Sequence, residues 1–413
     1  MKYLWTFFVI IDWMLFIPVA ATVAYLLVFA VASLFAHKRP TPKAKHLNRF
    51  IVLIPSYRQD KTILQSANAI LGQNYPQRLF DVVVISDHQS DMTNMRLAQL
   101  PVTLLTPNFE ESSKAKSLQW AIKNLPQFKI YDAVIILDAD NIVEPEFLEQ
   151  MNNAYETAGT KAIQAHRMSR NRDTTPARFD AIFEEINNSI FRKGHIALGL
   201  SAAISGSGML FEFDWFKRSI MKSRDAVGED KELEALLMRE AIYVDYFEDI
   251  HVYDEKTRRI DDFNRQRGRW AYTQFHLLMN NLRFFPRALL GRHYDLLDKL
   301  LQWMLVPRTI MMGIIMLMSI MGVLGLVLPF ASTASAIKWW VAGALVLFAF
   351  SLATPDYLVD EHWDSDFLVS PMVTIWGLFN IFRVGKDEAD SRINTVGRNI
   401  RRMASNTIKH KSR

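Results

Sequence analysis

The stretch VIILDADN (Val134–Asn141) places two carboxylates directly after an apolar run. Its valine, isoleucine and leucine residues predict a buried β-strand that ends at Asp138 and Asp140. The i, i+2 spacing lets both carboxylates approach one hard cation such as Mg²⁺ or Mn²⁺, or a metal-bound phosphate. In the alternative interpretation, Asp138 and Asn141 cap the helix that begins near EPEF (144–147). The stretch alone leaves both interpretations open.

Apolar runs that alternate with helix-length segments surround this stretch. RFIVLIPSY (49–57) and FDVVVISDH (80–88) are typical of strands, and residues 62–71 and 114–125 are typical of helices. Continuous apolar strands between helices indicate a mostly parallel sheet that is covered on both faces, so we expect an α/β domain over residues 46–286. In such sheets ligands bind beyond the carboxyl ends of the strands, where the polar ends of these runs would meet.

The composition excludes several kinds of site. The chain has no cysteine, which excludes disulfides, a thiolate nucleophile and cysteine-ligated metals. It has neither GxGxxG after the first strand nor GxxxxGK[ST], so a dinucleotide fingerprint and a Walker loop are both missing from the sequence. The basic clusters flank apolar segments and form no continuous stripe, so nucleic acid is not an expected partner.

The N-terminal region predicts a membrane anchor. Leu4 to Ala36 contains a single charge, Asp12, and is longer than the roughly 20 residues that a membrane span needs. The basic segment HKRPTPKAKH (37–46) follows it, which predicts a cytoplasmic flank and an N-terminus outside. We therefore expect an N-terminal membrane unit over residues 1–45 and a cytoplasmic domain after it, most simply at a bacterial inner membrane.

The C-terminal region predicts further membrane contact. Residues 309–354 have the pattern of a transmembrane hairpin, preceded by an interfacial helix over 287–308. A shorter apolar run at 367–382 contains Pro371 and leads into a basic tail, so we expect an interfacial helix and a cytoplasmic tail over 355–413. This gives three spans, and a fourth span over 367–382 is the alternative.

Two further segments hold candidate site residues. In GEDKEL (228–233), Glu229 and Asp230 precede an amphipathic helix, so they either cap it or supply Asp230 as a general base for an acceptor hydroxyl. In SGSG (205–208), the residues Gly206, Ser207 and Gly208 either let the backbone approach a substrate closely or form a plain tight turn.

Basic and aromatic residues mark two other segments. Lys114 and Lys116 lie at the start of a predicted helix, where the helix dipole disfavours cations, so they fit an anionic partner such as phosphate or are surface lysines. If DDFNRQRGRWAY (261–272) is helical, Gln266 and Arg269 share one face and Trp270 lies four residues after Gln266. An arginine fork suits a diphosphate and an indole suits a sugar face, whereas the alternative is anchoring at the membrane surface.

Taken in order, these motifs resemble the family 2 glycosyltransferases, in particular the membrane-embedded group with cellulose, chitin and hyaluronan synthases and ceramide glucosyltransferases. The resemblance covers about Phe50 to Trp270. DADN is similar to the DxD motif of the family, GEDKEL to its ED motif and QRGRW to its QxxRW motif. VLIPSYRQD and VVVISDHQSD resemble its two nucleotide-binding strands and loops. The sequence departs from the family at Ser86, where many members have an acid, and at Ser113 and Gln119 around the lysine segment.

The resemblance implies a GT-A fold and a membrane-bound, inverting transfer of a sugar from a UDP-sugar to a hydroxyl acceptor, with a β-linked product as in polysaccharide elongation. It implies that Asp138 and Asp140 hold a divalent metal, Mg²⁺ or Mn²⁺, and that Asp230 is the catalytic base. The implied donor-binding residues are Pro55, Ser56, Tyr57, Asp87, Lys114, Asp138, Gln266 and Arg269. The implied acceptor-binding residues are Gly206, Ser207, Gly208, Glu229 and Trp270.

Two alternatives remain for the function. The acceptor is a lipid at the inner leaflet in the first, and the chain is a non-catalytic, nucleotide-sugar-binding subunit of a synthase complex in the second. Either a homo-oligomer or an export partner could complete a polymer channel, since few spans are expected in this chain.

Overall fold

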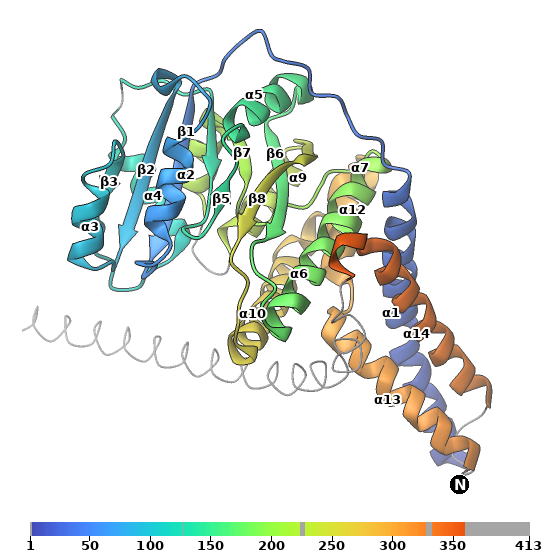
Figure 1. Ribbon diagram of the computed structural model, residues 1–413. Coiled ribbons are helices and arrows are strands. Elements are labelled where there is room, and N and C mark those ends of the chain that lie inside the picture. Colours follow the sequence, from blue (N-terminus) through green and yellow to red (C-terminus); the bar gives the residue numbers. More distant parts are fainter. Residues whose placement is uncertain (1, 127, 224–227, 328–332, 360–413) are drawn as a thin grey trace, which may run out of the picture.

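A computed structural model describes residues 2–126, 128–223, 228–327 and 333–359. It consists of an α/β domain joined to a bundle of long apolar helices (Figure 1). The interfacial helix expected at 367–382 and the basic tail after it lie outside the described residues.

The α/β domain is built on one eight-stranded sheet with the strand order β3-β2-β1-β4-β7-β6-β8-β5. The strands β3, β2, β1 and β4 run parallel, as do β6 and β8, whereas β7 is antiparallel to both of its neighbours and β5 to β8. The predicted α/β class with a largely parallel sheet is therefore confirmed. The strands are β1 Phe50–Tyr57, β2 Phe80–Asp87, β3 Thr103–Leu105, β4 Ala133–Ile136, β5 Ile142–Val143, β6 Ala162–Ser169, β7 Met209–Glu212 and β8 Val244–Asp254.

The strand register brings the polar strand ends to one edge. Tyr57 at the end of β1 pairs with Asp87 at the end of β2. Ile136, the last residue of β4, pairs with Met209, the first residue of the antiparallel strand β7. The segment after β4 and the segment before β7 therefore lie side by side, which brings the DADN stretch next to the SGSG loop.

Helices cover both faces of the sheet because its strands are apolar on both sides. Ile51 and Leu53 of β1 belong to one buried cluster, and Val52 and Ile54 belong to another. Successive side chains of a strand point to opposite faces, so this alternation separates two cores. The first core packs against α4 (Lys114–Asn124), α8 (Phe213–Ile220) and α9 (Glu229–Arg239), and the second against α2 (Ile63–Leu71), α3 (Asp91–Leu97) and α5 (Phe147–Ala158).

Several helices connect this domain to the membrane region. They are α6 (Thr175–Asn187), the π-helix η2 (Asn188–Lys193), α7 (Gly194–Ala197), α10 (Ile260–Asn281), η3 (Leu282–Phe284), α11 (Phe285–Leu290) and α12 (Tyr294–Met304). The remaining short 3-10 helices are η1 (Gln77–Leu79) and η4 (Asp356–Leu358).

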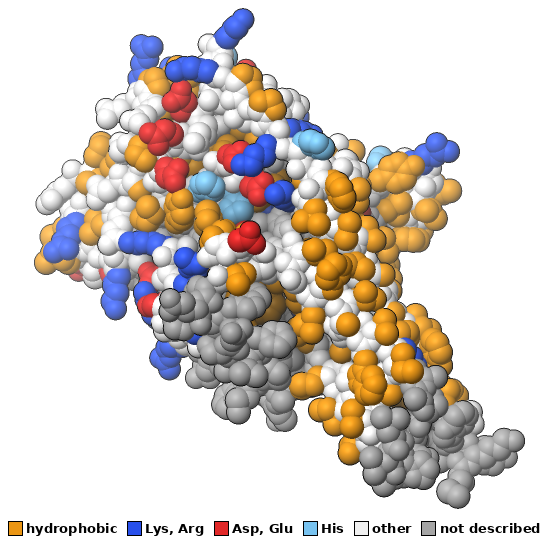
Figure 2. Space-filling model, turned by 45° about the vertical axis from the view of Figure 1, so that its right-hand side comes forward, with side chains coloured by type: hydrophobic (Ala, Val, Ile, Leu, Met, Phe, Trp, Pro, Cys, Tyr) orange, Lys and Arg blue, Asp and Glu red, His pale blue; other side chains and the backbone are white. Residues whose placement is uncertain are grey.

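The long apolar helices are α1 (Lys2–Leu34), α13 (Arg308–Val327) and α14 (Thr333–Ala353). Within the described residues, Val9–Leu34 and Ala336–Ala353 are long and apolar enough to cross a membrane, and a pair of helices bent by 50° at the α12 to α13 break would make a third span. Figure 2 shows hydrophobic side chains gathered over this bundle. The chain is therefore built for membrane association.

The single acid of α1 is neutralised inside the bundle. Asp12 forms an ion pair with Lys338 of α14 and accepts a hydrogen bond of 2.7 Å from the Trp339 indole nitrogen. An intramembrane charge is tolerated when it is paired in this way. The same bundle continues toward the α/β domain, since Phe29 of α1 shares a buried cluster with Ile190 of η2.

Candidate active site

The ends of β1 and β2 bring several polar side chains together. The buried carboxylate of Asp87 accepts through Oδ1 from the ring of His88, at 2.5 Å, and its Oδ2 has no hydrogen-bond partner among the described groups. Ser56 accepts a hydrogen bond of 2.5 Å from Gln89, and the half-exposed ring of Tyr57 meets the His88 ring at 5.7 Å. A buried carboxylate oxygen without a donor is costly, so this position fits a ligand N–H such as that of a nucleobase.

The DADN stretch folds into a closed turn after β4. The backbone N–H of Asp138 donates to Oδ1 of Asn141 and to Oγ of Ser207, both at 3.0 Å, and the Ser207 hydroxyl itself bonds Asn141. The side-chain amide of Asn141 donates to Oδ1 of Asp140 at 3.1 Å. These hydrogen bonds therefore join the turn to the SGSG loop, and the side chains of Asp138 and Asp140 both belong to this turn.

The capping interpretation of DADN is wrong. The helix that follows it, α5, has Glu146 at its N-cap position, and no side-chain cap bond is present there. The side-chain oxygen of Asn141 instead accepts a hydrogen bond from the backbone N–H of Asp138. Neither Asp138 nor Asp140 therefore caps α5.

Lys114 lies at the centre of the site. Its ammonium is 2.5 Å from Oδ1 of Asp138, 2.6 Å from the carbonyl oxygen of Gly206 and 3.6 Å from Oε1 of Glu229. Burial alone would lower the pKa of Lys114, but Asp138 and Glu229 outweigh burial and hold the pKa above its ordinary value. A charged ammonium thus joins the lysine segment, DADN, SGSG and GEDKEL at one point.

Two other sequence candidates make contacts of a different kind. Pro55 is buried within β1, opposite Ile85, so its ring contributes to the sheet. Lys116 donates to the carbonyl of Glu111 at 2.8 Å, which agrees with the surface-lysine interpretation of this residue.

Glu229 and Asp230 lie in the first turn of α9, not before it. The N-cap residue is Gly228 and no side-chain cap bond is present, so the predicted N-cap role is wrong, although the acids still match the positive end of the helix dipole. Burial raises the pKa of Glu229 to about 7, Lys114 opposes that rise, and Asp230 adds to it. The first turn therefore holds a carboxyl group that gains and loses its proton near neutral pH.

Glycines border the Asp230 carboxylate on two sides. A Cβ on Gly206 would lie 3.3 Å from Oδ2 of Asp230, and a Cβ on Gly228 would lie 3.0 Å from its Oδ1. Both glycines have φ of 82°, a conformation that side-chain-bearing residues rarely adopt. The SGSG segment is therefore a turn that also allows close approach of its backbone to the acid.

The carboxylates of Asp138 and Asp140 fit a divalent cation in part. Burial and the neighbouring charges of Asp138 and Asp254 raise the pKa of Asp140 to about 6, with Arg167 opposing the rise. A cation between the two acids would remove that repulsion. Among the described residues no group of three or more His, Asp or Glu side chains could hold a metal, so further ligands would have to come from a bound diphosphate or water.

The QRGRW segment is helical, which is the condition under which Gln266 and Arg269 share one face, because α10 runs through it. The position of a Cβ on Gly228 lies 3.7 Å from a methyl group of Thr273, so α10 passes beside the start of α9. Trp270 is 44% exposed. The side chains of Gln266 and Arg269 lie outside the described part of the structure.

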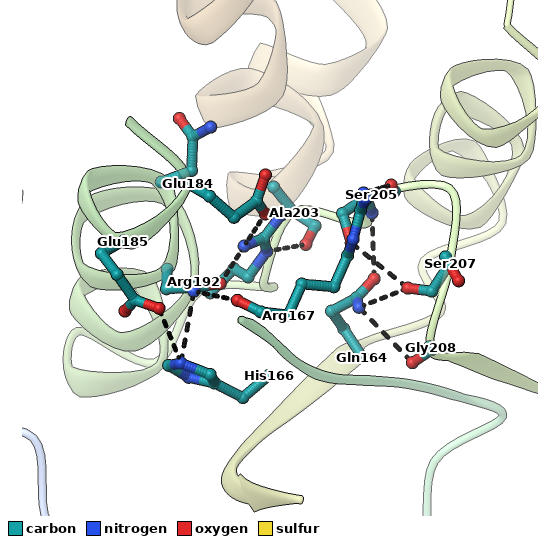
Figure 3. Close-up of polar contacts among 12 residues, drawn as sticks. Gln164, His166, Arg167, Glu184, Glu185, Arg192, Ala203, Ser205, Ser207 and Gly208 are labelled. Atoms are coloured by element: carbon teal, nitrogen blue, oxygen red, sulfur yellow. Dashed lines mark hydrogen bonds and ion pairs between the residues drawn. The ribbon is translucent and has the colours of Figure 1, made fainter. Parts of the chain in front are cut away.

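Three polar residues of strand β6 were missed from the sequence. Gln164 donates to the Ser207 carbonyl at 2.9 Å and accepts from the Ser205 N–H at 2.9 Å, while Arg167 donates to the Ser205 carbonyl at 2.6 Å (Figure 3). The third, His166, is buried and bonds Glu185 at 3.0 Å. The signal that could have revealed them is the run of polar residues in an otherwise apolar strand, AIQAHRMS (162–169).

Known proteins place this architecture in context. The family model described as "Glycosyltransferase like family 2" matches residues 48–273, over half of the chain. Mannosyltransferase PcManGT from Pyrobaculum calidifontis, solved with GDP-Man and Mn²⁺, is 16% identical with a TM-score of 0.51, covering 82% of this chain and 99% of that one. TarS 1–349 from S. aureus, solved with UDP-GlcNAc, is 13% identical with a TM-score of 0.42, covering 82% and 92%. No curated protein matches the chain.

The first of these similarities is one of fold. It agrees with the α/β domain described above and confirms the expected GT-A architecture.

Proposed function

The chain belongs to the glycosyltransferase-like family 2, and we propose that it is a membrane-bound, inverting enzyme that moves a sugar from a UDP-linked donor to a hydroxyl acceptor. In this proposal the acceptor is the end of a growing polysaccharide and the new linkage is β. The catalytic domain faces the cytoplasm of a bacterial cell, where nucleotide sugars are available.

The observation that carries the proposal is the position of Lys114. One ammonium contacts Asp138, Glu229 and the Gly206 carbonyl, although these groups come from segments far apart in the chain. A buried cation among acids is suited to exchange a carboxylate for a phosphate oxygen when a donor binds.

Donor binding would use the edge formed by β1, β2 and β4. The unpartnered oxygen of Asp87 would accept from the base, with Ser56 and Tyr57 beside it, and Lys114 would meet the diphosphate.

Asp138 and Asp140 would hold the divalent cation, which when bound would neutralise charge on the leaving diphosphate. Gln266 and Arg269, on the helix that passes beside α9, would complete the diphosphate site.

Acceptor activation would use Asp230. Its carboxylate would take the proton of the acceptor hydroxyl while the acceptor oxygen bonds the anomeric carbon. The bond from that carbon to the diphosphate oxygen breaks, and UDP leaves with the electron pair. Attack from the side opposite the leaving group converts an α-linked donor into a β-linked product. Gly206, Ser207, Gly208, Glu229 and Trp270 would border the acceptor.

A lipid acceptor is the second candidate, because one observation favours it. Leu290 is 86% exposed and Leu289 is 57% exposed, at the end of α11, which follows α10 and η3 in the chain. Exposed leucines beside membrane helices are suited to the bilayer boundary, where a lipid headgroup could reach the site.

The test is a turnover screen with the purified full-length chain in detergent or in membranes. A panel of UDP-sugars, with GDP-mannose included, is incubated with Mn²⁺ or Mg²⁺, and release of the nucleoside diphosphate is measured. Turnover of one UDP-sugar supports the proposal. Turnover of GDP-mannose alone would show that the donor is GDP-linked and not UDP-linked. Binding of UDP-sugars without any release in native membranes would favour a non-catalytic subunit.

Product analysis with a labelled sugar then separates the acceptors. An alkali-stable polymer supports chain elongation, whereas a labelled product that partitions into organic solvent supports the lipid acceptor.

A further inference from the structure

Five buried charged side chains form a chain of alternating sign that the proposed reaction does not use. Their side chains are between 4% and 15% exposed. In order they are Arg192, Glu184, Lys256, Asp254 and Arg167. The successive separations between their charged atoms are 3.1, 3.7, 2.9 and 2.5 Å.

Both ends of this chain bind the same backbone segment. Nε of Arg192 donates to the carbonyl of Ala203 at 3.2 Å, and a terminal nitrogen of Arg167 donates to the carbonyl of Ser205 at 2.6 Å (Figure 3). These two carbonyls lie three residues and one residue before Gly206, whose own carbonyl contacts Lys114. The two arginines therefore fix the entry to the SGSG loop from one side while Lys114 holds it from the other.

The Arg192 end of the network also lies next to the apolar helix α1. Arg192 belongs to the π-helix η2, a local geometry that is uncommon and often occurs at functional sites. Ser189 of η2 bonds Ser33 of α1 at 2.9 Å, and a Cβ on Gly194 would lie only 2.3 Å from the Phe29 carbonyl. The backbones of η2, α7 and α1 are thus in close contact.

Stability alone is a weak reason to bury five charges. Buried ion pairs contribute little compared with apolar packing of the same volume, since the cost of removing them from water offsets their attraction. In this network the arginines fix the orientation of the groups that they bind, because the donors of a guanidinium form a rigid planar fork. Arg167 uses two different nitrogens of one planar fork, one for a carboxylate on β8 and the other for a carbonyl at the loop entry.

We propose that Arg167 is a positioning residue that holds the loop at 205–208 in the orientation that the acceptor requires. The inference rests on the proposed function for its catalytic consequence. It predicts that loss of the Arg167 fork loosens the loop and misplaces the acceptor relative to Asp230, while the donor site, built on β1, β2 and β4, stays intact.

The variant that tests this is Arg167→Lys in the full-length protein. Lysine keeps the positive charge next to Asp254 but removes the two-point fork. Arg170→Lys is the matched control, because Arg170 is exposed and its side chain donates to Gln65 at 3.2 Å.

The first readout is hydrogen–deuterium exchange of the backbone amides at 203–208. In Arg167→Lys these amides are expected to exchange about tenfold faster, as for loss of one charge-assisted hydrogen bond, while peptides from α2 and α5 are unchanged. Unchanged exchange at 203–208 overturns the proposal. This readout needs no substrate, so it decides the inference even if the wild-type chain turns over no nucleotide sugar.

The second readout is the coupling of UDP release to transfer. Arg167→Lys is expected to bind UDP as tightly as the wild type and to lose about tenfold in glycosylated product, with a larger share of UDP released by hydrolysis. Equal product yield in the two proteins overturns the catalytic consequence. If the lysine variant fails to fold, Arg167→Gln replaces it in both measurements, because it also removes the two-point fork while Lys256 continues to pair with Asp254.

Discussion

The ammonium of Lys114 lies 2.5 Å from the carboxylate of Asp138, across 24 residues of sequence. This contact joins the start of α4 to the turn after β4. The same ammonium reaches the Gly206 carbonyl and Glu229, so one cation organises four segments of the site. The predictions below perturb the groups around it.

Replacement of the proposed base should separate donor binding from transfer. Asp230→Asn keeps the shape of the side chain between Gly206 and Gly228 but removes its ability to accept a proton. We expect UDP affinity, measured by calorimetry, to stay within about twofold, and transfer to fall by about 100-fold or more. Asp214→Asn, at an exposed position on α8, is the control. Substantial transfer by Asp230→Asn would rule out this base.

Removal of divalent cations should stop the reaction. Asp138 and Asp140 repel one another when both are ionised, and we expect a divalent cation to be needed to bring them to a diphosphate. EDTA is expected to abolish UDP release, and added Mn²⁺ or Mg²⁺ is expected to restore it. Asp140→Asn should raise the Mn²⁺ concentration needed for half-maximal rate. Turnover that persists in EDTA would contradict the role of the two acids.

A single methyl group at the loop should disturb the site. Gly206→Ala adds a Cβ 3.3 Å from Oδ2 of Asp230 at a φ of 82°. We expect a backbone cost of roughly 1–2 kcal/mol together with a loss of transfer larger than that strain explains. The control is Gly199→Ala, where φ is 75° and nothing lies within 4 Å of the new atom. Similar transfer rates for the two variants would show that contact with Asp230 has no catalytic effect.

The pH dependence of stability should report the buried carboxyl of Glu229. Its pKa is about 7 in the folded protein and 4.5 for an ordinary glutamate, so the folded state binds the proton more tightly. This group therefore lowers stability as pH rises from about 4.5 to about 7. Glu229→Gln removes the titration, so its melting temperature should rise relative to the wild type by a few degrees more at pH 8 than at pH 5. A difference in melting temperature that is the same at both pH values would argue against the raised pKa.

Local sequence patterns were sufficient for the elements that carry the motifs. The apolar runs at 49–57 and 80–88 became β1 and β2, and the segments at 62–71 and 114–125 became α2 and α4 with boundaries shifted by one residue. A helix through QRGRW was considered from the sequence only as a condition, and α10 fulfils it. These features follow from burial periodicity, which depends on neighbours along the chain.

Capping was less predictable. Ser113 caps α4 through its hydroxyl, whereas Asn141 and Asp230, which have equally favourable side chains, cap nothing. Whether a side chain accepts from a helix N–H or from another donor depends on which donor lies next to it in the folded chain. In the DADN turn, the donor next to the Asn141 oxygen is the backbone N–H of Asp138.

The sequence by itself established the order of motifs, the alternation of strands and helices and the apolar helices, because each of these is written in local periodicity and composition. The tertiary structure decided which side chains meet. Strand β7 returns antiparallel beside β4, so the loop at 205–208 arrives next to Asp138, and β6 lies beside β7, so Arg167 reaches Ser205. Contacts of this kind depend on strand order and register across the sheet, and no short-range pattern in the chain encodes them.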